Sequence, residues 1–290
     1  MSCAAAGSQS NKQQKMGAMH FIMIGAMVRF WTPVVLALVL AAPAAADMKA
    51  ADAALGRHDE GGALAALKPA AESGDARAQI ALGEMYLAGR GVERDSEIAV
   101  MWFRRAAAQG SAEAALALGL VYAQGMGVEI DPKEAAKWLR QAADAGEEEA
   151  QAKLAGLYLN GIGVEESDEE AFKWFQRAAA GGNPDYQLNV ALMYGQGVGV
   201  DQNLAQSLTW MRMAADQGLT RAQINLGIMY YQGMGVEADL AQAHAWFALA
   251  GGQGDTQALA ARDTLAQEMT PEQIAASARL VAEWQPRMNR

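Results

Sequence analysis

Cysteine and histidine are almost absent from this chain of 290 residues. The only cysteine is Cys3, so the chain cannot form an internal disulfide or a cysteine-ligated zinc site. Beyond the N-terminal segment the only histidines are His58 and His244, no serine lies close to either in the sequence, and there is no G-x-S-x-G motif. We therefore expect no catalytic residue, no cofactor and no metal site, and we predict that the protein is not an enzyme.

Acidic residues are missing from positions 1–46, which hold Lys12, Lys15 and Arg29 and then the apolar run VVLALVLAAPAAA. Positive charge, a short apolar core and small residues before Asp47 are typical of a secretory signal peptide. The part before this core is long for a signal, so we expect translation to start at Met27. The alternative is an uncleaved anchor, because residues 21–46 are long enough to span the inner membrane. We expect an exported, periplasmic protein.

The net charge of −10 becomes −13 once the three positive charges of residues 1–46 are removed. An acidic surface disfavours nucleic acid and anionic lipid as partners. Any membrane contact is therefore expected only through the N-terminal segment. Carboxylate runs such as Glu147-Glu148-Glu149 fall at expected helix starts and turns, where solvation and the helix dipole account for them.

The chain repeats itself every 36 residues. Each copy carries a tyrosine, then G-x-G-V, a tryptophan and a closing glycine, and no insertion or deletion breaks the register from Ala78 to Gly254. Such a period indicates stacked supersecondary units. The paired glycines are therefore loop punctuation and do not form a phosphate-binding loop. The first glycines are Gly89, Gly125, Gly161, Gly197 and Gly233, and the tryptophans are Trp102, Trp138, Trp174, Trp210 and Trp246.

Each unit is predicted to contain two helices joined by the glycine loop. In the second copy Gly125 and Gly127 are expected to take positive φ values and reverse the chain. Asp131 suits the N-cap of the second helix and Pro132 its first turn, while Glu134 completes a capping box. Four of the five copies have such a box. Small residues at Gly83 and its equivalents are expected to bring the helices close together, and the tryptophans to fill the core.

The run A-x-x-x-L-G-x-x-Y-x-x-G-x-G-V-x-x-D, followed by A-x-x-W-x-x-x-A-A-x-x-G, resembles the Sel1-like repeat, a relative of the tetratricopeptide repeat. Residues 112–146 match it nearly throughout, and the likeness covers about 180 residues. The resemblance implies an all-α, right-handed α-solenoid with helical caps and a concave face for protein–protein contact.

The expected domains follow from the repeat. Residues 1–46 are the signal or membrane segment, and residues 47–77 form a degenerate N-terminal capping repeat. Five repeats follow at 78–113, 114–149, 150–185, 186–221 and 222–254. Residues 255–290 form C-terminal capping helices that cover the last repeat, because terminal units of solenoids are atypical.

The best candidates for a partner-binding face are polar columns on the first helices. Asparagine is a poor helix former, so its presence there suggests contact with the backbone of a bound protein or peptide. Solvated surface residues or local hydrogen bonds are the alternative explanation. The candidate residues are Gln151, Lys153, Gln187, Asn189, Gln223 and Asn225.

These observations favour a scaffold or adaptor for protein–protein interaction in the bacterial cell envelope, with a regulatory role among the functions that the resemblance implies. A cell-wall-active or β-lactam-binding enzyme of the cysteine-rich Sel1-like type is an alternative. That type carries a disulfide in each repeat, which this chain lacks. A membrane-tethered structural spacer is a second alternative, and an uncleaved N-terminal segment would favour it.

Overall fold

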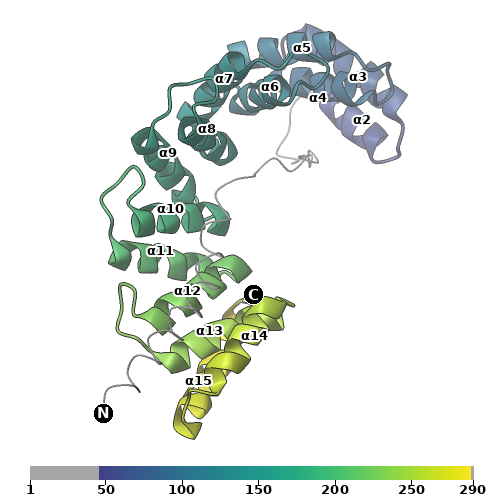
Figure 1. Cartoon of the computed structure of the whole chain (residues 1–290). Helices are drawn as coiled ribbons and strands as arrows, with labels where there is room; N and C mark the ends of the chain where they lie inside the picture. The colour runs from purple at the N-terminus through teal and green to yellow at the C-terminus, as the bar shows by residue number, and fades with distance from the viewer. Residues whose placement is uncertain (1–45, 289–290) are drawn as a thin grey trace, which may run out of the picture. The chain divides into compact units, whose positions relative to one another are not determined.

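The computed structural model describes the backbone of residues 46–288 and the side chains of residues 48–285. The expected export signal and the alternative anchor therefore lie, apart from Ala46, outside the described residues. Within the described part every regular element is an α-helix, which confirms the predicted all-α repeat solenoid (Figure 1). None of the helices between residues 46 and 288 is both long enough and apolar enough to cross a membrane.

Ten helices of 13 residues alternate along the repeats. The first helices are α4 (Ala76–Ala88), α6 (Ala112–Gln124), α8 (Glu148–Asn160), α10 (Pro184–Gln196) and α12 (Thr220–Gln232). The second helices are α5 (Ser96–Ala108), α7 (Pro132–Asp144), α9 (Asp168–Ala180), α11 (Leu204–Asp216) and α13 (Leu240–Gly252). The flanking helices are α2 (Ala46–Leu55), α3 (Glu60–Glu72), α14 (Thr256–Ala266) and α15 (Pro271–Met288).

The described chain divides into two compact units. The N-terminal unit comprises residues 46–182 with 198–200, and the C-terminal unit comprises residues 183–197 and 201–288. Within each unit a first helix packs on the second helix of its own repeat. That second helix then packs on the next first helix, as in α5 on α6, α7 on α8 and α11 on α12. Each unit is therefore a stack of helix hairpins.

The glycine loops have the predicted conformation. Gly125 has φ of +63° and ends α6 by donating its N–H to the carbonyl oxygen of Val121, and Gly127 has φ of +77°. All ten glycines of the five loops have positive φ. At the second glycine of the loop, the backbone of the preceding repeat also comes very close. A Cβ on Gly163 would overlap the carbonyl oxygen of Pro132, the first residue of the preceding repeat's second helix.

The N-caps of the second helices are confirmed, but the reciprocal half of the capping box is wrong in the repeats. Asp131 accepts hydrogen bonds from the N–H groups of Lys133 and Glu134, as expected. Its own N–H donates to the carbonyl oxygen of Tyr122 at 3.0 Å instead of to Glu134. The same bond to the tyrosine carbonyl recurs in all five repeats, at 2.8–3.0 Å. The loop brings this carbonyl, which is otherwise unpaired at the end of the first helix, to the start of the second helix. The Glu134 carboxylate instead accepts hydrogen bonds from the side chains of Lys137 and Trp138.

The small-residue column brings the two helices of a repeat into contact, as predicted. A Cβ on Gly119 would lie 2.6 Å from the side chain of Leu139, and a Cβ on Gly83 would lie 2.6 Å from Phe103. Large side chains fill the gaps beside these contacts. Trp102, Trp174 and Trp246 are buried, whereas Trp138 and Trp210 are half-buried. A second buried column, one residue after each tryptophan, was not singled out from the sequence. It comprises Phe103, Leu139, Phe175, Met211 and Phe247.

The ends of the stack are covered by modified units. At the N-terminus α2 and α3 pack as a hairpin, and the Asp59 side chain caps α3 through the N–H of Gly62. At the C-terminus α13 packs against both α14 and α15. Trp284 of α15 stacks on Trp246 with ring centroids 4.4 Å apart. An apolar face of the last repeat is thereby removed from water.

Candidate partner-binding surface

The glutamines of the first helices are buried within the stack. Gln79, Gln151, Gln187 and Gln223 have exposed fractions of 8% or less. Nε2 of Gln151 donates to the carbonyl oxygen of Ala143 at 3.1 Å, and Gln79 and Gln223 make the same bond to Ala71 and Ala215. Each of these three amides thus satisfies a carbonyl in the last turn of the preceding second helix.

A second set of glutamines completes the arrangement. Nε2 of Gln109, Gln217 and Gln253 donates to Oε1 of Gln79, Gln187 and Gln223 at 2.9, 2.9 and 3.1 Å. The side-chain amides of Gln187 and Gln223 are therefore engaged inside the stack and are not presented to solvent. Their role in partner binding stays a prediction, and the structure assigns them a role in packing as well.

The other three candidates lie one helical half-turn further along. Lys153 is half-buried and pairs with Glu149 at 3.2 Å. Asn189 is half-buried on α10, so a partner can reach part of its side chain. Asn225 is only 7% exposed, and its Oδ1 has no hydrogen-bond partner among the described residues. Of the six candidates, Lys153 and Asn189 are the ones most open to direct contact.

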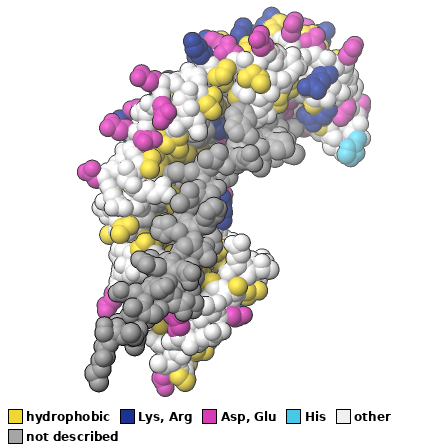
Figure 2. Space-filling model, in the orientation of Figure 1, with side chains coloured by type: hydrophobic (Ala, Val, Ile, Leu, Met, Phe, Trp, Pro, Cys, Tyr) yellow, Lys and Arg dark blue, Asp and Glu magenta, His cyan; other side chains and the backbone are white. Residues whose placement is uncertain are grey.

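Acidic side chains gather at the starts of α6 and α8. Burial, followed by the negative charge of Glu113, raises the pKa of Glu84 to about 7, and Arg90 opposes this shift. Burial also raises the pKa of Glu147, together with the charges of Glu149, Glu113 and Glu148 in decreasing order. On the face that Figure 2 shows, Asp and Glu side chains also lie at many places along the chain. The surface at the starts of α6 and α8 is therefore acidic.

A column of arginines, which the sequence analysis missed, joins second helices to the tyrosines of the following repeat. Nη2 of Arg104 donates to the hydroxyl of Tyr122 at 2.8 Å, and Nη1 of Arg212 donates to Tyr230 at 2.9 Å. The guanidinium of Arg140 lies 5.5 Å from the ring centre of Tyr158, within the range of a cation–π contact. Arg104 and Arg140 are 36 residues apart and Arg212 lies a further 72 residues along the chain, with Gln176 between, but their tyrosine partners depend on how the helices stack.

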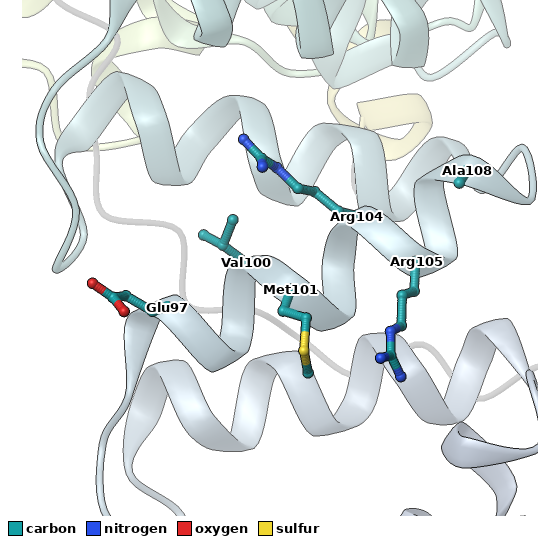
Figure 3. Close-up of a pocket in the computed structure, with 6 residues that line it drawn as sticks. All are labelled: Glu97, Val100, Met101, Arg104, Arg105 and Ala108. Atoms are coloured by element: carbon teal, nitrogen blue, oxygen red, sulfur yellow. The ribbon is translucent and has the colours of Figure 1, made fainter.

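The described surface also has a shallow hollow of about 420 Å³ on α5, lined by Glu97, Val100, Met101, Arg104, Arg105 and Ala108 (Figure 3). Met101 and Arg105 point to one side of the helix and Arg104 to the other. Arg105 lies over the ring of Trp102, 4.8 Å from its centre. Both arginines are thus held by aromatic rings, and only Met101, 38% exposed, is a large apolar side chain open to solvent here.

The fold brings one serine and one histidine together, although they lie far apart in the sequence. Ser277 Oγ lies 2.7 Å from Nδ1 of His244, because α13 packs on α15 and brings together residues 33 positions apart. Burial lowers the pKa of His244, Arg262 adds to the effect and Asp263 opposes it. Ser277 is fully buried, so its hydroxyl is not accessible to a substrate carbonyl in this structure. The pair links the last repeat to the C-terminal helix.

Comparisons with known proteins agree with this architecture. The family model of the Sel1 repeat matches residues 76–111, 112–147, 148–183, 184–219 and 220–255, each segment beginning two residues before the boundary expected from the sequence. A Sel1 repeat protein from Oxalobacter formigenes is 31% identical over 73% of this chain and 87% of its own, with a TM-score of 0.67. A protective antigen of uropathogenic Escherichia coli that displays an SLR fold is 30% identical over 79% of this chain and 57% of its own, with a TM-score of 0.48. No curated protein matches. Since five consecutive repeats cover more than half of its length, the chain belongs to the Sel1 repeat family.

Proposed function

We propose that this protein is a non-enzymatic scaffold or adaptor that binds another protein, or a peptide, along the face that its first helices line. Sel1 repeat proteins generally mediate protein–protein interaction. The Sel1 scaffold is typically non-enzymatic, and the buried Ser277 beside His244 fits a structural role. The proposal further places the protein in the cell envelope, where it organises or regulates its partner.

One contrast within the repeats carries the proposal. Positions that build the stack keep their residue type every 36 residues, as do the loop glycines and the tyrosines whose carbonyls accept the N-cap N–H groups. Positions open to solvent on the first helices change in charge from one repeat to the next. One such column reads Arg77, Glu113, Glu149, Asp185 and Arg221. This variety gives the repeats different surface charges, which supports recognition of a particular partner, and one pair in the column, Arg221 with Asp185, also joins two repeats.

The envelope location rests on the composition of residues 1–46. Three positive charges, no acidic residue and an apolar run before Asp47 favour export and removal of the signal. Fractionation of cells, followed by N-terminal sequencing of the envelope protein, tests this step. A chain beginning at Asp47 supports export with cleavage. An intact chain in the membrane fraction contradicts cleavage and favours the tethered spacer.

Crosslinking and affinity capture from envelope fractions test the adaptor function. The informative variant is Lys153→Glu combined with Asn189→Arg, because both side chains are accessible and neither closes a buried hydrogen bond. Asn225 is left unchanged, since an arginine at this buried position would disturb the packing of α12. Thr209→Arg on the exposed side of α11 is the matched control.

We expect a specific partner to be held by the parent and by the control, and lost by the double variant while its circular dichroism stays unchanged. Loss from both the control and the double variant would indicate that charge in general, and not the first-helix face, governs binding. Capture of no specific partner by the parent would contradict the adaptor function. Hydrolysis of a reporter β-lactam by the purified protein would contradict the non-enzymatic assignment.

A further inference from the structure

One repeat lacks a donor that the glutamine pairs of three other repeats possess. Gln109, Gln217 and Gln253 each donate to a buried glutamine of their own repeat. In the second repeat both positions are alanine, Ala115 and Ala145, so nothing is left unpaired. In the third repeat Gln151 is present, but the donor position is Gly181, which has no side chain.

The missing side chain leaves an acceptor without a donor. Oε1 of Gln151 is buried and has no hydrogen-bond partner among the described residues, while Nε2 is held by the carbonyl oxygen of Ala143. A Cβ on Gly181 would overlap the carboxylate of Glu148, so this carboxylate lies where the donor side chain would begin. By the register of the other repeats, Oε1 of Gln151 faces the same place. The Glu148 carboxylate and the unpaired Oε1 of Gln151 thus both border the place of the missing side chain, and a buried acceptor without a donor is unfavourable.

The surroundings of this point are acidic. Glu147 is the N-cap residue of α8, yet its side chain makes no capping hydrogen bond, unlike Ser111 at the start of α6. Its carboxylate is therefore not committed to the helix. Glu113, Glu148 and Glu149 are close enough to raise the pKa of Glu147 further. Among the described residues of this cluster, Glu149 is the one with a cation close by, Lys153 at 3.2 Å. A positive group with N–H donors is what this cluster lacks.

We propose that a lysine or arginine side chain of the bound partner enters at the place of the missing side chain on Gly181 and donates to Oε1 of Gln151 and to the carboxylate of Glu148. The inference rests on the proposed adaptor function and names the chemistry of one contact. Gly181 and Glu148 are both exposed, so rotation of the Glu148 side chain admits the cation. No group of three or more potential metal ligands occurs among the described residues, so a cation that carries its own N–H donors fits better than a metal ion.

A single substitution in the protein itself supplies the missing hydrogen-bond donor. Gly181 has φ of −70° and ψ of −9°, a helical conformation that glutamine adopts without strain. In Gly181→Gln we expect the new amide to take the place of Gln109 or Gln217, and the atoms nearest to its Cβ belong to the end of the flexible Glu148 side chain. Ala145→Gln is the matched control, because it adds the same side chain to the same helix position in a repeat that has Ala115 instead of glutamine.

The test titrates the purified full chain with a blocked peptide of alternating lysine and glycine, and with the same peptide acetylated on every lysine. The side-chain amide resonance of Gln151 and the dissociation constant are measured. We expect the lysine peptide to shift this resonance, the acetylated peptide to leave it unchanged, and Gly181→Gln to weaken binding by about tenfold or more, as loss of a charge-assisted hydrogen bond predicts. Ala145→Gln should bind like the parent.

Equal binding by the parent and Gly181→Gln would overturn the proposed contact and leave only a general attraction of the peptide to the acidic surface. Absence of any shift at Gln151 in the parent would also overturn it. The melting temperature of Gly181→Gln serves as the folding control and is expected to equal or exceed that of the parent. Capture of the natural partner by Gly181→Gln at full strength would refute this contact while leaving the adaptor function intact, so the two failures are distinguishable.

Discussion

Nε2 of Gln109 donates a 2.9 Å hydrogen bond to Oε1 of Gln79, a residue 30 positions earlier in the same repeat. Gln79 in turn donates to the carbonyl oxygen of Ala71 at the end of α3. Three consecutive helices are thereby joined through two side-chain amides. Gln79 is 3% exposed, so removal of either partner leaves a polar atom away from water.

We expect Gln109→Ala to lower the free energy of unfolding by about 1–2 kcal/mol, because Oε1 of Gln79 then loses its donor. Chemical denaturation of the purified protein measures the change. Gln176→Ala, an exposed glutamine on α9, is the control and should change stability by less than about 0.5 kcal/mol. Equal effects of the two substitutions would show that the Gln109 bond does not stabilise the stack.

Two glycines with positive φ allow the cost of backbone strain to be measured apart from the cost of a steric overlap. Gly182 has φ of +97° and open space around a Cβ, so Gly182→Ala should destabilise by about 1–2 kcal/mol from strain alone. Gly163 has φ of +72°, and a Cβ there would also overlap the carbonyl oxygen of Pro132. Gly163→Ala should therefore cost about 3 kcal/mol or more. Urea denaturation of both variants measures the difference, and similar values would refute the close contact.

The raised pKa of Glu84 predicts a pH-dependent stability. In the unfolded chain this carboxyl ionises near its ordinary value of 4.5, whereas in the fold it keeps its proton until about pH 7. The stabilising contribution of the protonated form is therefore complete below pH 4.5 and is lost as the pH rises through 7. Glu84→Gln keeps a neutral side chain at every pH and should be more stable than the parent at pH 8, with little difference at pH 4.

Unfolding free energies at a series of pH values between 4 and 8 measure this effect. Glu93→Gln, which changes an exposed carboxylate in the loop before α5, is the control and should follow the parent curve. Parallel curves for the parent and Glu84→Gln would contradict the raised pKa.

His244 has the opposite dependence. Burial lowers the pKa of its imidazole below 6.5, so the folded protein favours the neutral ring that contacts Ser277. Its contribution to stability is complete above pH 6.5 and declines as the pH falls from there through the lower pKa of the fold, because the unfolded chain binds the proton first. His244→Gln should remove this decline. His58→Asn, at an exposed position, should retain it, and a decline that survives in His244→Gln would refute the assignment.

Much of the fold could be predicted because the same residue pattern occurs in all five repeats. A glycine at Gly125 or Gly127 is ambiguous alone, but the same pair every 36 residues can only be a loop between repeated helices. The N-cap at Asp131 was predicted for the same reason. The second half of the capping box was wrong because a sequence pattern shows only local partners. The Tyr122 carbonyl reaches the N–H of Asp131 only after the loop has closed.

The candidate site was less predictable. The polar columns of the first helices were visible in the sequence, but the pattern did not show that Gln187 and Gln223 are buried and hydrogen-bonded across 30 residues. The pair of His244 and Ser277 was missed because α13 and α15 are separated by a whole helix. The unpaired Oε1 of Gln151 became visible only beside the completed pairs of the other repeats.

The sequence by itself determined the helical repeat, its period, its loops and its family, since each depends on residues close together along the chain. Glycine conformations, N-caps and helix faces all arise within one 36-residue unit. Only the tertiary structure decided which polar side chains satisfy one another and which remain without a donor. The reason is geometric: stacking places positions 30 to 36 residues apart within hydrogen-bond distance, and whether an amide such as that of Gln151 is paired depends on the residue it meets there.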